Sequence, residues 1–288
     1  MAAKRRLKLA TSNRASEKLA SILTATSALI VAAALFFILG DVFAKGLSGL
    51  NFEFLTEETS DAGRGGGIFP IIVSTVSILA IAIAVALPLG LGTAIYLSEF
   101  SRRNPFTAQV VRNSLDVLAA TPSIVFGLFG NAIFCRMMGL GYCLLAGGLT
   151  LACMVLPIMI RTLEVSLRRV PDDYRFAASS LGLSRTRLTL SILLPCALPG
   201  LIVGIVLGVG RVLAETAALL FTSGYVDRMP GSWLDSGRTL SIHIYDLSMI
   251  VTGGEPNAYK TAVVLIGLLL LINGTTLMIV QTWKRRLR

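Results

Sequence analysis

The sequence has 288 residues, of which 54% are hydrophobic and 15% charged, and its mean hydropathy is +0.76. A soluble domain carries about 25% charged residues, so this balance points to a membrane protein. The formal net charge of +10 resembles that of a nucleic-acid-binding protein. However, the Lys and Arg residues stand in short clusters between apolar runs, without the interleaved aromatic residues of a single-strand binder. The composition therefore excludes nucleic acid as a partner and favours lipid.

Six stretches of the chain are long and apolar enough to cross a membrane. A transmembrane helix needs about 20 apolar residues to span a hydrocarbon core about 30 Å thick. We expect such helices at residues 20–43, 69–97, 110–135, 143–162, 196–222 and 260–283. The second and third stretches are longer than the core requires, so they tilt or extend beyond it. The chain is therefore expected to be an all-α, multi-pass integral protein of an inner (plasma) membrane.

The first of these stretches follows a basic segment, residues 1–19, in the manner of a secretory signal peptide. Val42-Phe43-Ala44 is an acceptable cleavage pattern, so a cleaved signal is an alternative. The apolar run is longer than a usual signal core, and its removal would leave an odd number of spans. We therefore expect residues 20–66 to comprise an uncleaved first helix and an outer loop.

The Lys and Arg residues are distributed unevenly over the connections. Most of them precede the first span, follow the second, lie between the fourth and fifth, or form the basic tail at residues 284–288. Positively charged residues near the ends of spans are retained on the cytoplasmic side. Both termini are therefore expected in the cytoplasm, which an even number of spans also requires.

Two longer connections fall on the outer side. Residues 44–68 carry four acidic residues and the turn-rich run Gly63-Arg64-Gly65-Gly66-Gly67. Residues 223–259 form the longest outer loop, in which the stretch from Leu240 to Tyr245 is predicted to be a short helix resting at the membrane surface.

The four cysteines and the single histidine give little evidence of a site. Cys135, Cys143, Cys153 and Cys196 lie in or beside apolar segments, without a CxxC pair or zinc-ligand spacing. Cys135 and Cys143 flank one short connection, so a disulfide there is an alternative to simple apolar filling. Because the chain has only His243 as an imidazole ligand, no metal site is expected.

The connection between the fourth and fifth spans, residues 164–195, has the pattern of two short helices separated by a turn. The run from Val170 to Asp173 marks a helix start, since its proline is tolerated in a first turn and its acidic residues suit the helix dipole. Gly182, followed two residues later by Ser184, marks a helix stop and a new N-cap. From the residues alone, the first helix, about 172–183, either offers its small residues to another protein or lies on the lipid surface.

The spacing of Phe176-Ala177-Ala178, Gly182 and Ile192-Leu193-Leu194-Pro195 is similar to a cytoplasmic signature of the permease subunits of bacterial ABC importers, Glu-Ala-Ala-x3-Gly-x9-Ile-x-Leu-Pro. Members of that family have the type I importer permease fold, and this loop carries the coupling helix that fits a cleft on the ATP-binding subunit. The resemblance assigns this role to Phe176, Ala177, Ala178, Gly182 and Pro195. Phe176 stands where the family usually has Glu, which puts a polar contact of that Glu with the ATPase in doubt.

Three further runs resemble phosphate permeases, and the last resembles the PstA-type subunit more than its partner subunit. These runs extend from Ala119 to Gly130, from Leu156 to Thr162 and from Gly210 to Thr222. The resemblance implies that residues 67–283 form the permease domain of one half of an ATP-driven importer for inorganic phosphate. A permease for another oxyanion (sulfate, molybdate or tungstate) is the nearest alternative, and an autonomous secondary transporter is a more distant one.

The resemblance also implies partners: a sister permease that completes a heterodimer, two copies of an ATP-binding subunit, and a periplasmic or surface-tethered phosphate-binding protein. The chain has no GxxxxGK[ST] phosphate-binding loop, and the glycines at 63–67 lack the following Lys. We therefore expect this subunit to be no enzyme and to bind no cofactor, while ATP and Mg are used by the partner ATPase.

Five residues within the spans are candidates for the translocation pathway. Arg211 and Glu215, four residues apart, would share one face of a helix, and a central Arg costs about 2.5 to 3.5 kcal/mol unless it faces protein or water. The pair either only fixes packing, or Arg211 offers its guanidinium to a passing phosphate while Glu215 limits the affinity. Arg161 either extends its charged group to the cytoplasmic interface (snorkelling) or has a role on the cytoplasmic side of the pathway, where the anion leaves. Pro122 and Ser123 either open backbone groups toward the pathway or only kink the third span.

Overall fold

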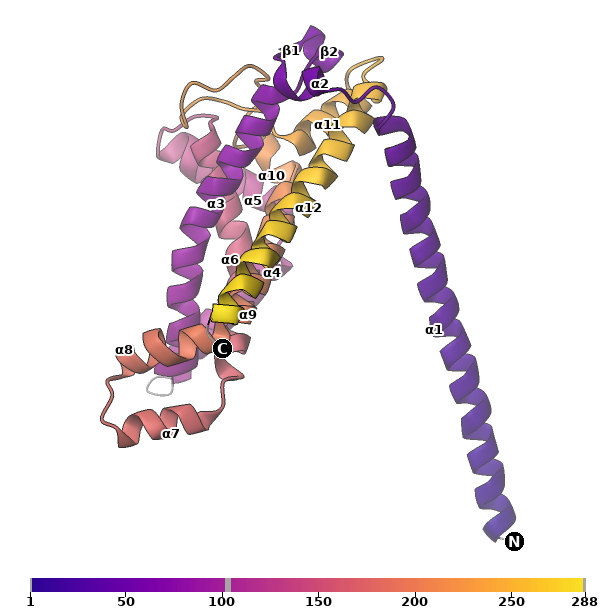
Figure 1. Ribbon diagram of the computed structural model, residues 1–288, viewed down its shortest axis with the longest axis vertical. Helices are drawn as coiled ribbons and strands as arrows, with labels where there is room; N and C mark the ends of the chain where they lie inside the picture. Colours follow the sequence, from indigo (N-terminus) through magenta and orange to yellow (C-terminus); the bar gives the residue numbers. More distant parts are fainter. Residues whose placement is uncertain (1, 102–104, 287–288) are drawn as a thin grey trace.

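The computed structural model describes the backbone of residues 2–101 and 105–286 and the side chains of residues 17–101, 105–278 and 281. Within these ranges the fold is helical, with one two-stranded hairpin (Figure 1). Five described helical segments are long and apolar enough to cross a membrane, and there are six if a strongly bent helix pair is one span. The expected all-α membrane fold is therefore confirmed.

The first helix, α1 (Ala2–Gly46), stands apart from the other helices along most of its length (Figure 1). Its apolar part, Glu17–Gly46, has almost all of its side chains on the surface, as suits a segment surrounded by lipid. Near its C-terminal end it reaches α12, where Lys45 Nζ donates to the hydroxyl of Tyr259 at 3.2 Å. Lys45 also pairs with Asp41 at 2.8 Å.

Short elements occupy the outer connection that follows. Helix α2 (Phe52–Thr56) leads into an antiparallel hairpin of β1 (Thr59–Ser60) and β2 (Gly65–Gly66), in which Thr59 is opposite Gly66. The long helix α3 (Phe69–Ile95) then crosses the molecule and is extended by a π-helical turn at Tyr96–Phe100.

The third span, expected at residues 110–135, is bent at Pro122, in agreement with the kink that was one of the two interpretations of this proline, and it begins earlier, at Pro105. Helix α4 (Pro105–Ala120) and helix α5 (Ser123–Gly130), with its π-helical extension Asn131–Met137, form a pair bent by 104°. Pro122 stands at the break: it has no N–H to donate to a helical hydrogen bond, and its ψ of 144° is extended rather than helical.

The fourth and fifth spans flank the cytoplasmic loop. Helix α6 (Leu144–Arg168) is longer than the expected 143–162, and the loop helices α7 (Asp172–Ser180) and α8 (Arg185–Leu188) follow it. Helix α9 (Leu194–Leu213) is continuous with α8 through a π-helical turn, residues 189–193. The expected fifth span, 196–222, is therefore too long, because regular helix stops at Leu213.

The last elements are α10 (Ala217–Leu220), α11 (Leu240–Met249) and α12 (Glu255–Arg286). The expected helix at the membrane surface exists as α11, but its placement at the surface is wrong. Leu240, Ile242 and Leu247 on α11 are fully buried, since the helix packs between α12 and α3.

The core lies where α3, α6 and α9 pack together. Buried side chains such as Ile78, Leu151, Met159 and Val209 meet there. Lipid is as apolar as these side chains, so close van der Waals packing, rather than escape from water, holds such helices together. Gly148 on α6 permits this approach, because a Cβ there would lie 2.5 Å from Cγ2 of Ile81 on α3.

Figure 1 shows both termini and the helices α7 and α8 at one end of the molecule, and the hairpin and α11 at the other. This is the arrangement that the cytoplasmic orientation of both termini requires. Cys135 and Cys143 are buried and free, and the Cys143 sulfur accepts from the N–H of Ala146 at the start of α6, at 3.4 Å. The two cysteines are therefore not joined in a disulfide, and Cys143 caps α6 as well as filling apolar space.

Candidate functional site

The loop between α6 and α9 has the two-helix form that its sequence predicts. Pro171 occupies the N-cap of α7, and Asp172 and Asp173 lie in its first turn, where the helix dipole favours negative charge. Gly182 ends the helix with a φ of +67°, a conformation that glycine adopts without strain. Ser184 then caps α8, and its hydroxyl accepts from the N–H of Arg187 at 3.3 Å.

The candidate coupling residues differ sharply in exposure. Phe176 and Leu181 are 69% and 77% exposed, and Ala177 is also exposed. Ala178, by contrast, is 2% exposed and belongs to a second cluster of buried side chains, the cytoplasmic core, which includes Leu97, Leu163 and Leu193. Of the alanine pair, only Ala177 is therefore available to a partner, while Ala178 holds α7 against its own subunit. Pro195 lies in the first turn of α9 and is half-buried.

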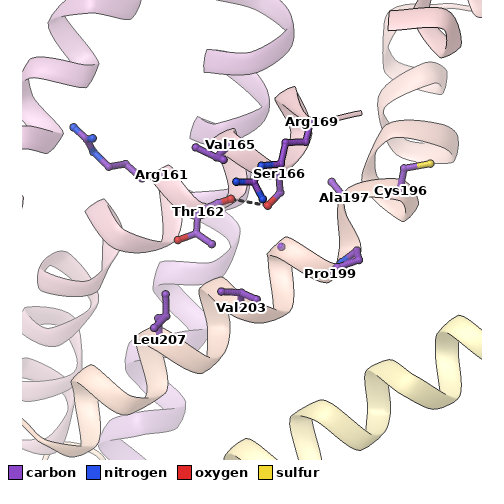
Figure 2. Close-up of a pocket in the computed structure, with 11 residues that line it drawn as sticks. Arg161, Thr162, Val165, Ser166, Arg169, Cys196, Ala197, Pro199, Val203 and Leu207 are labelled. Atoms are coloured by element: carbon purple, nitrogen blue, oxygen red, sulfur yellow. Dashed lines mark hydrogen bonds between the residues drawn. The ribbon is translucent and has the colours of Figure 1, made fainter. Parts of the chain in front are cut away.

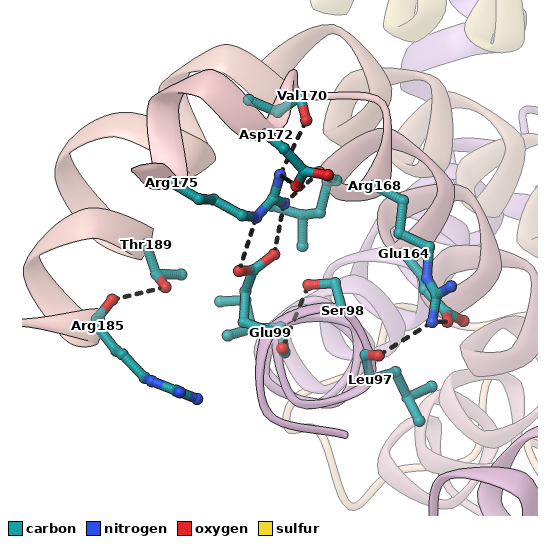
Figure 3. A network of polar contacts seen from close by, with 12 residues as sticks. Leu97, Ser98, Glu99, Glu164, Arg168, Val170, Asp172, Arg175, Arg185 and Thr189 are labelled. Atoms are coloured by element: carbon teal, nitrogen blue, oxygen red, sulfur yellow. Dashed lines mark hydrogen bonds and ion pairs between the residues drawn. The ribbon is translucent and has the colours of Figure 1, made fainter. Parts of the chain in front are cut away.

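Arg175 attaches α7 to the cytoplasmic end of α3 (Figure 3). Its Nε and Nη2 donate to the two carboxylate oxygens of Glu99, at 3.1 and 2.7 Å. The same guanidinium donates to the carbonyls of Val170 at 2.9 Å and Leu167 at 3.1 Å, which cap the end of α6. The hydrogen bonds that Arg175 donates to the Glu99 carboxylate raise the pKa of Arg175 further above its ordinary value. One side chain thus joins three elements of the subunit.

A second group of ion pairs lies beside the first. The carboxylate of Glu164 on α6 is 3.0 Å from Arg112 on α4 and 3.0 Å from Arg168. Both arginines also donate to the carbonyl of Leu97, in the π-helical turn after α3. Sequence analysis missed Glu99, Glu164 and Arg112 because their partners are far away in the chain. Glu164 had no clear signal, since the fourth span was expected to end at residue 162 and only the structure shows that α6 continues past Glu164.

The structure brings Arg211 and Glu215 together, but not on one continuous helix. Arg211 lies in the last turn of α9, and Glu215 follows in the break before α10, so the expected mid-span position on a straight helix is wrong. Arg211 Nη2 is 3.6 Å from Glu215 Oε2, and the Arg211 side chain is 50% exposed while that of Glu215 is 5% exposed. The other carboxylate oxygen accepts from the N–H of Ala218 at 3.2 Å. The carboxylate is therefore fixed, whereas the guanidinium has a free side.

Arg161 forms an ion pair with Asp116 on α4. It also lines a groove of about 550 Å³ between α6 and α9. Figure 2 shows Thr162 and Ser166 on the α6 side of this groove, and Val203 and Leu207 on the α9 side. Because Leu207 is one helical turn before Arg211, the groove leads along α9 toward the Arg211–Glu215 pair.

Pro122 and Ser123 lie at the bend between α4 and α5, away from the lining of the groove. Helix α5 packs closely on α10, because a Cβ at Gly127 would lie 2.8 Å from Cα of Ala218. The bend in the third span therefore adjoins the break after α9. Among the described side chains, no group of three or more His, Cys, Asp or Glu residues could hold a metal ion.

Comparisons with known proteins agree with this architecture. A family model described as "Binding-protein-dependent transport system inner membrane component" matches residues 86–287. The probable ABC transporter permease protein YqgI of Bacillus subtilis is 33% identical over 245 residues, which are 81% of this chain and 83% of the relative. The phosphate transport system permease protein PstA of Yersinia pestis is 35% identical over 211 residues, which are 73% of this chain and 71% of the relative.

Among solved structures, the inward-facing MetNI methionine ABC transporter matches with a TM-score of 0.59 and 19% identity, over 75% of this chain and 94% of that chain. This likeness concerns the fold alone. The family match covers well over half of the chain and includes the loop, the groove and the Arg211–Glu215 pair. The chain therefore belongs to the family of inner membrane components of binding-protein-dependent transport systems, and it is a multi-pass, non-catalytic ABC importer permease that works with a separate ATPase and a substrate-binding protein.

Proposed function

We propose that this chain is one transmembrane half of an ATP-driven importer for inorganic phosphate. The observation that carries the proposal is the similarity to phosphate permeases of the PstA type, which are 34% and 35% identical to this chain in Pasteurella multocida and Yersinia pestis. A half-exposed arginine beside a fixed carboxylate suits the passage of a phosphate oxyanion. The arginine attracts the anion, and the carboxylate prevents binding so tight that release fails.

In this proposal α7 is the coupling helix, which fits a cleft on the ATPase. Phe176, Ala177 and Leu181 supply an exposed surface without charge, so docking depends on shape more than on ion pairs. Gly182 and Pro195 set the turn and the return into α9. The complete transporter contains a sister permease, two copies of the ATPase, which use ATP and Mg, and a phosphate-binding protein. This chain itself binds no cofactor.

The translocation pathway follows the exposed face of α9. Phosphate delivered from outside meets Arg211 and Glu215 first, and then enters the groove lined by Arg161. The bend at Pro122 and Ser123 lets α5 approach α10 beside this route. Asp116 neutralises Arg161 while no anion is present.

The test is uptake of radioactive phosphate by the complete transporter in vesicles. Arg211→Ala should lower uptake about tenfold or more, because a hydrogen bond to a charged group contributes about 1.5 to 3 kcal/mol. Arg136→Ala, which changes an exposed arginine outside the pathway, should leave uptake unchanged. Normal uptake by Arg211→Ala at normal membrane levels would exclude a transport role for this residue. Sulfate or molybdate uptake in place of phosphate uptake would assign the other oxyanion permease function.

A further inference from the structure

The conformation of the chain at Glu215 depends on a helix that lies well beyond it in sequence. Glu215 is 4% exposed and stands where regular helix has ended. Its backbone carbonyl accepts a hydrogen bond from Ser241 Oγ of α11 at 2.6 Å. A buried carbonyl must be paired, so this contact fixes the peptide that follows Glu215. The direction of the carboxylate toward Arg211 is fixed with it.

Helix α11 is itself held in place at its first turn. The N–H of Leu240 donates to Thr75 Oγ1 on α3 at 2.9 Å, and the hydroxyls of Thr239 and Ser241 lie 3.0 Å apart. All four of these residues are buried. Ser241 is therefore a fixed donor rather than a mobile surface hydroxyl.

The opposite face of α11 lies under the outer hairpin. His243 is fully buried, and a Cβ at Gly63 would lie 2.5 Å from its Cε1. Gly63 has a φ of +92°, which favours glycine, and its carbonyl accepts from Asn257 Nδ2 of α12 at 2.9 Å. The turn between β1 and β2 therefore rests directly on the imidazole. A displacement of the hairpin would displace α11.

The first turn of α11 is also tied to the longest outer loop. Arg238 pairs with Asp246 at 3.0 Å, lies 3.3 Å from Nδ1 of His243, and donates from Nε to the carbonyl of Tyr225 at 3.1 Å. Helix α11 therefore contacts the hairpin on one side, through His243, and the break after α9 on the other, through Ser241. The helix is therefore a rigid connection between the two.

We propose that α11 is a rigid connection between the outer hairpin and the Arg211–Glu215 pair. In this proposal Ser241 is the positioning residue that orients the Glu215 carboxylate toward Arg211. The proposal rests on the proposed function, in which that pair meets the transported anion. A displacement of the outer hairpin would thereby reach the pair through Gly63, His243 and α11. Without the Ser241 hydroxyl, the carbonyl of Glu215 would turn toward another donor, and the N–H of Ala218 alone would hold the carboxylate.

The experiment uses the complete transporter in vesicles that contain ATP, with phosphate-loaded binding protein outside. Ser241→Ala should lower the maximal uptake rate about fivefold to tenfold, the effect of leaving a buried carbonyl unpaired. The phosphate concentration at half-maximal uptake should stay unchanged, because the binding protein sets it. Ser241→Thr keeps a hydroxyl and should restore most of the rate. Ser248→Ala, at an exposed serine on the same helix, should match wild type.

A double mutant separates positioning from general damage to the fold. If Ser241 acts through the carboxylate, adding Ser241→Ala to Glu215→Gln should cause little further loss, whereas a full additional loss would overturn the proposal. Reduced uptake by Glu215→Gln together with normal uptake by Ser241→Ala would overturn the positioning role alone. Normal uptake by Glu215→Gln would overturn both this proposal and the transport role of the pair. If Ser241→Ala does not reach the membrane, Ser241→Cys, with a weak donor of similar size, gives the same comparison.

Discussion

The guanidinium of Arg175 and the carboxylate of Glu99 face each other in a bidentate pair, with hydrogen bonds of 2.7 and 3.1 Å. The two side chains are only 18% and 10% exposed, so the pair is stronger than an ordinary surface ion pair. Arg175 belongs to α7, the proposed coupling helix, and Glu99 to the π-helical turn that extends α3. A movement imposed on α7 by the ATPase therefore reaches a membrane-spanning helix through this contact.

Weakening this pair should uncouple ATP hydrolysis from transport. Glu99→Gln keeps the size of the side chain but removes the buried carboxylate that pairs with Arg175, which then retains only the exposed carboxylate of Asp172, 3.2 Å away. We expect phosphate uptake per ATP hydrolysed to fall several-fold in reconstituted vesicles, while ATPase activity persists. Arg187→Gln is the matched control, since Arg187 is exposed in the same loop. An unchanged ratio of uptake to hydrolysis in Glu99→Gln would refute the role of the pair in coupling.

The adjacent alanines of the coupling helix should respond in opposite ways to the same substitution. Ala178→Leu should destabilise the subunit by about 1 to 3 kcal/mol, because a 2% exposed site has no room for a larger side chain. Ala177→Leu should change stability by less than about 0.5 kcal/mol, since Ala177 is exposed. It should nevertheless reduce the amount of ATPase that co-purifies with the permease. Thermal unfolding in detergent and pull-down of the ATPase measure the two effects, and equal ATPase recovery with Ala177→Leu would contradict the docking surface.

The bend in the third span should depend more on packing than on its proline. Gly127→Ala should destabilise the fold by about 1 to 3 kcal/mol, because the new Cβ would lie 2.8 Å from the backbone of Ala218. Pro122→Ala should cost less, since Asn131 Nδ2 still donates to the carbonyl of Phe221 at 2.8 Å and holds α5 on α10. Thermal unfolding of the two variants gives the comparison. A larger loss in Pro122→Ala than in Gly127→Ala would show that the proline itself maintains the bend.

The buried His243 should make the outer end of the subunit sensitive to acid. Burial, and secondly the charge of Arg238, lower the pKa of His243 to about 3 from its ordinary 6.5. Between about pH 3 and pH 6.5 the unfolded chain binds more protons than the folded one. The free energy of unfolding is therefore highest above pH 6.5 and falls as the pH decreases below that value. The loss at pH 5 is about 2 kcal/mol.

Unfolding temperatures measured from pH 5 to pH 8 test this expectation. His243→Gln should have a flatter pH dependence than wild type, because the substituted side chain does not titrate in this range. Since His243 is the single histidine of the chain, the difference between the two curves isolates its contribution. Parallel curves would show that the imidazole titrates normally in the folded protein.

Local signals predicted the coupling loop well. Pro171, Gly182 and Ser184 each stand at the helix boundary that their backbone preferences indicated, because caps and left-handed turns depend on neighbouring residues only. The exposure of Ala177 and the burial of Ala178 were not predictable in the same way. Both are small residues of one helix, and only the docking of α7 on the cytoplasmic core distinguishes them.

The breaks in the third and fifth spans had unequal signals. Pro122 indicated the break in the third span, but nothing in the sequence indicated its angle of 104°. The end of α9 at Leu213 had no comparable signal, since neither Pro nor Gly stands between Leu213 and Leu220. The break forms where the Glu215 side chain caps α10 and Ser241 binds the Glu215 carbonyl. The burial of α11 could not be predicted from the sequence either, because its neighbours α3 and α12 come from distant parts of the chain.

The sequence alone determined the membrane class, the approximate spans, the loop signature and the family resemblance, because hydropathy, charge distribution and turn residues act over a few neighbouring residues. Tertiary structure decided which charges meet. It joins charged side chains from separate elements, in the pairs Glu99–Arg175, Glu164–Arg112 and Asp116–Arg161. It also brings the Ser241 hydroxyl to the backbone carbonyl of Glu215. Such pairings follow from how the helices pack, and a buried polar group is stable only where that packing supplies its partner.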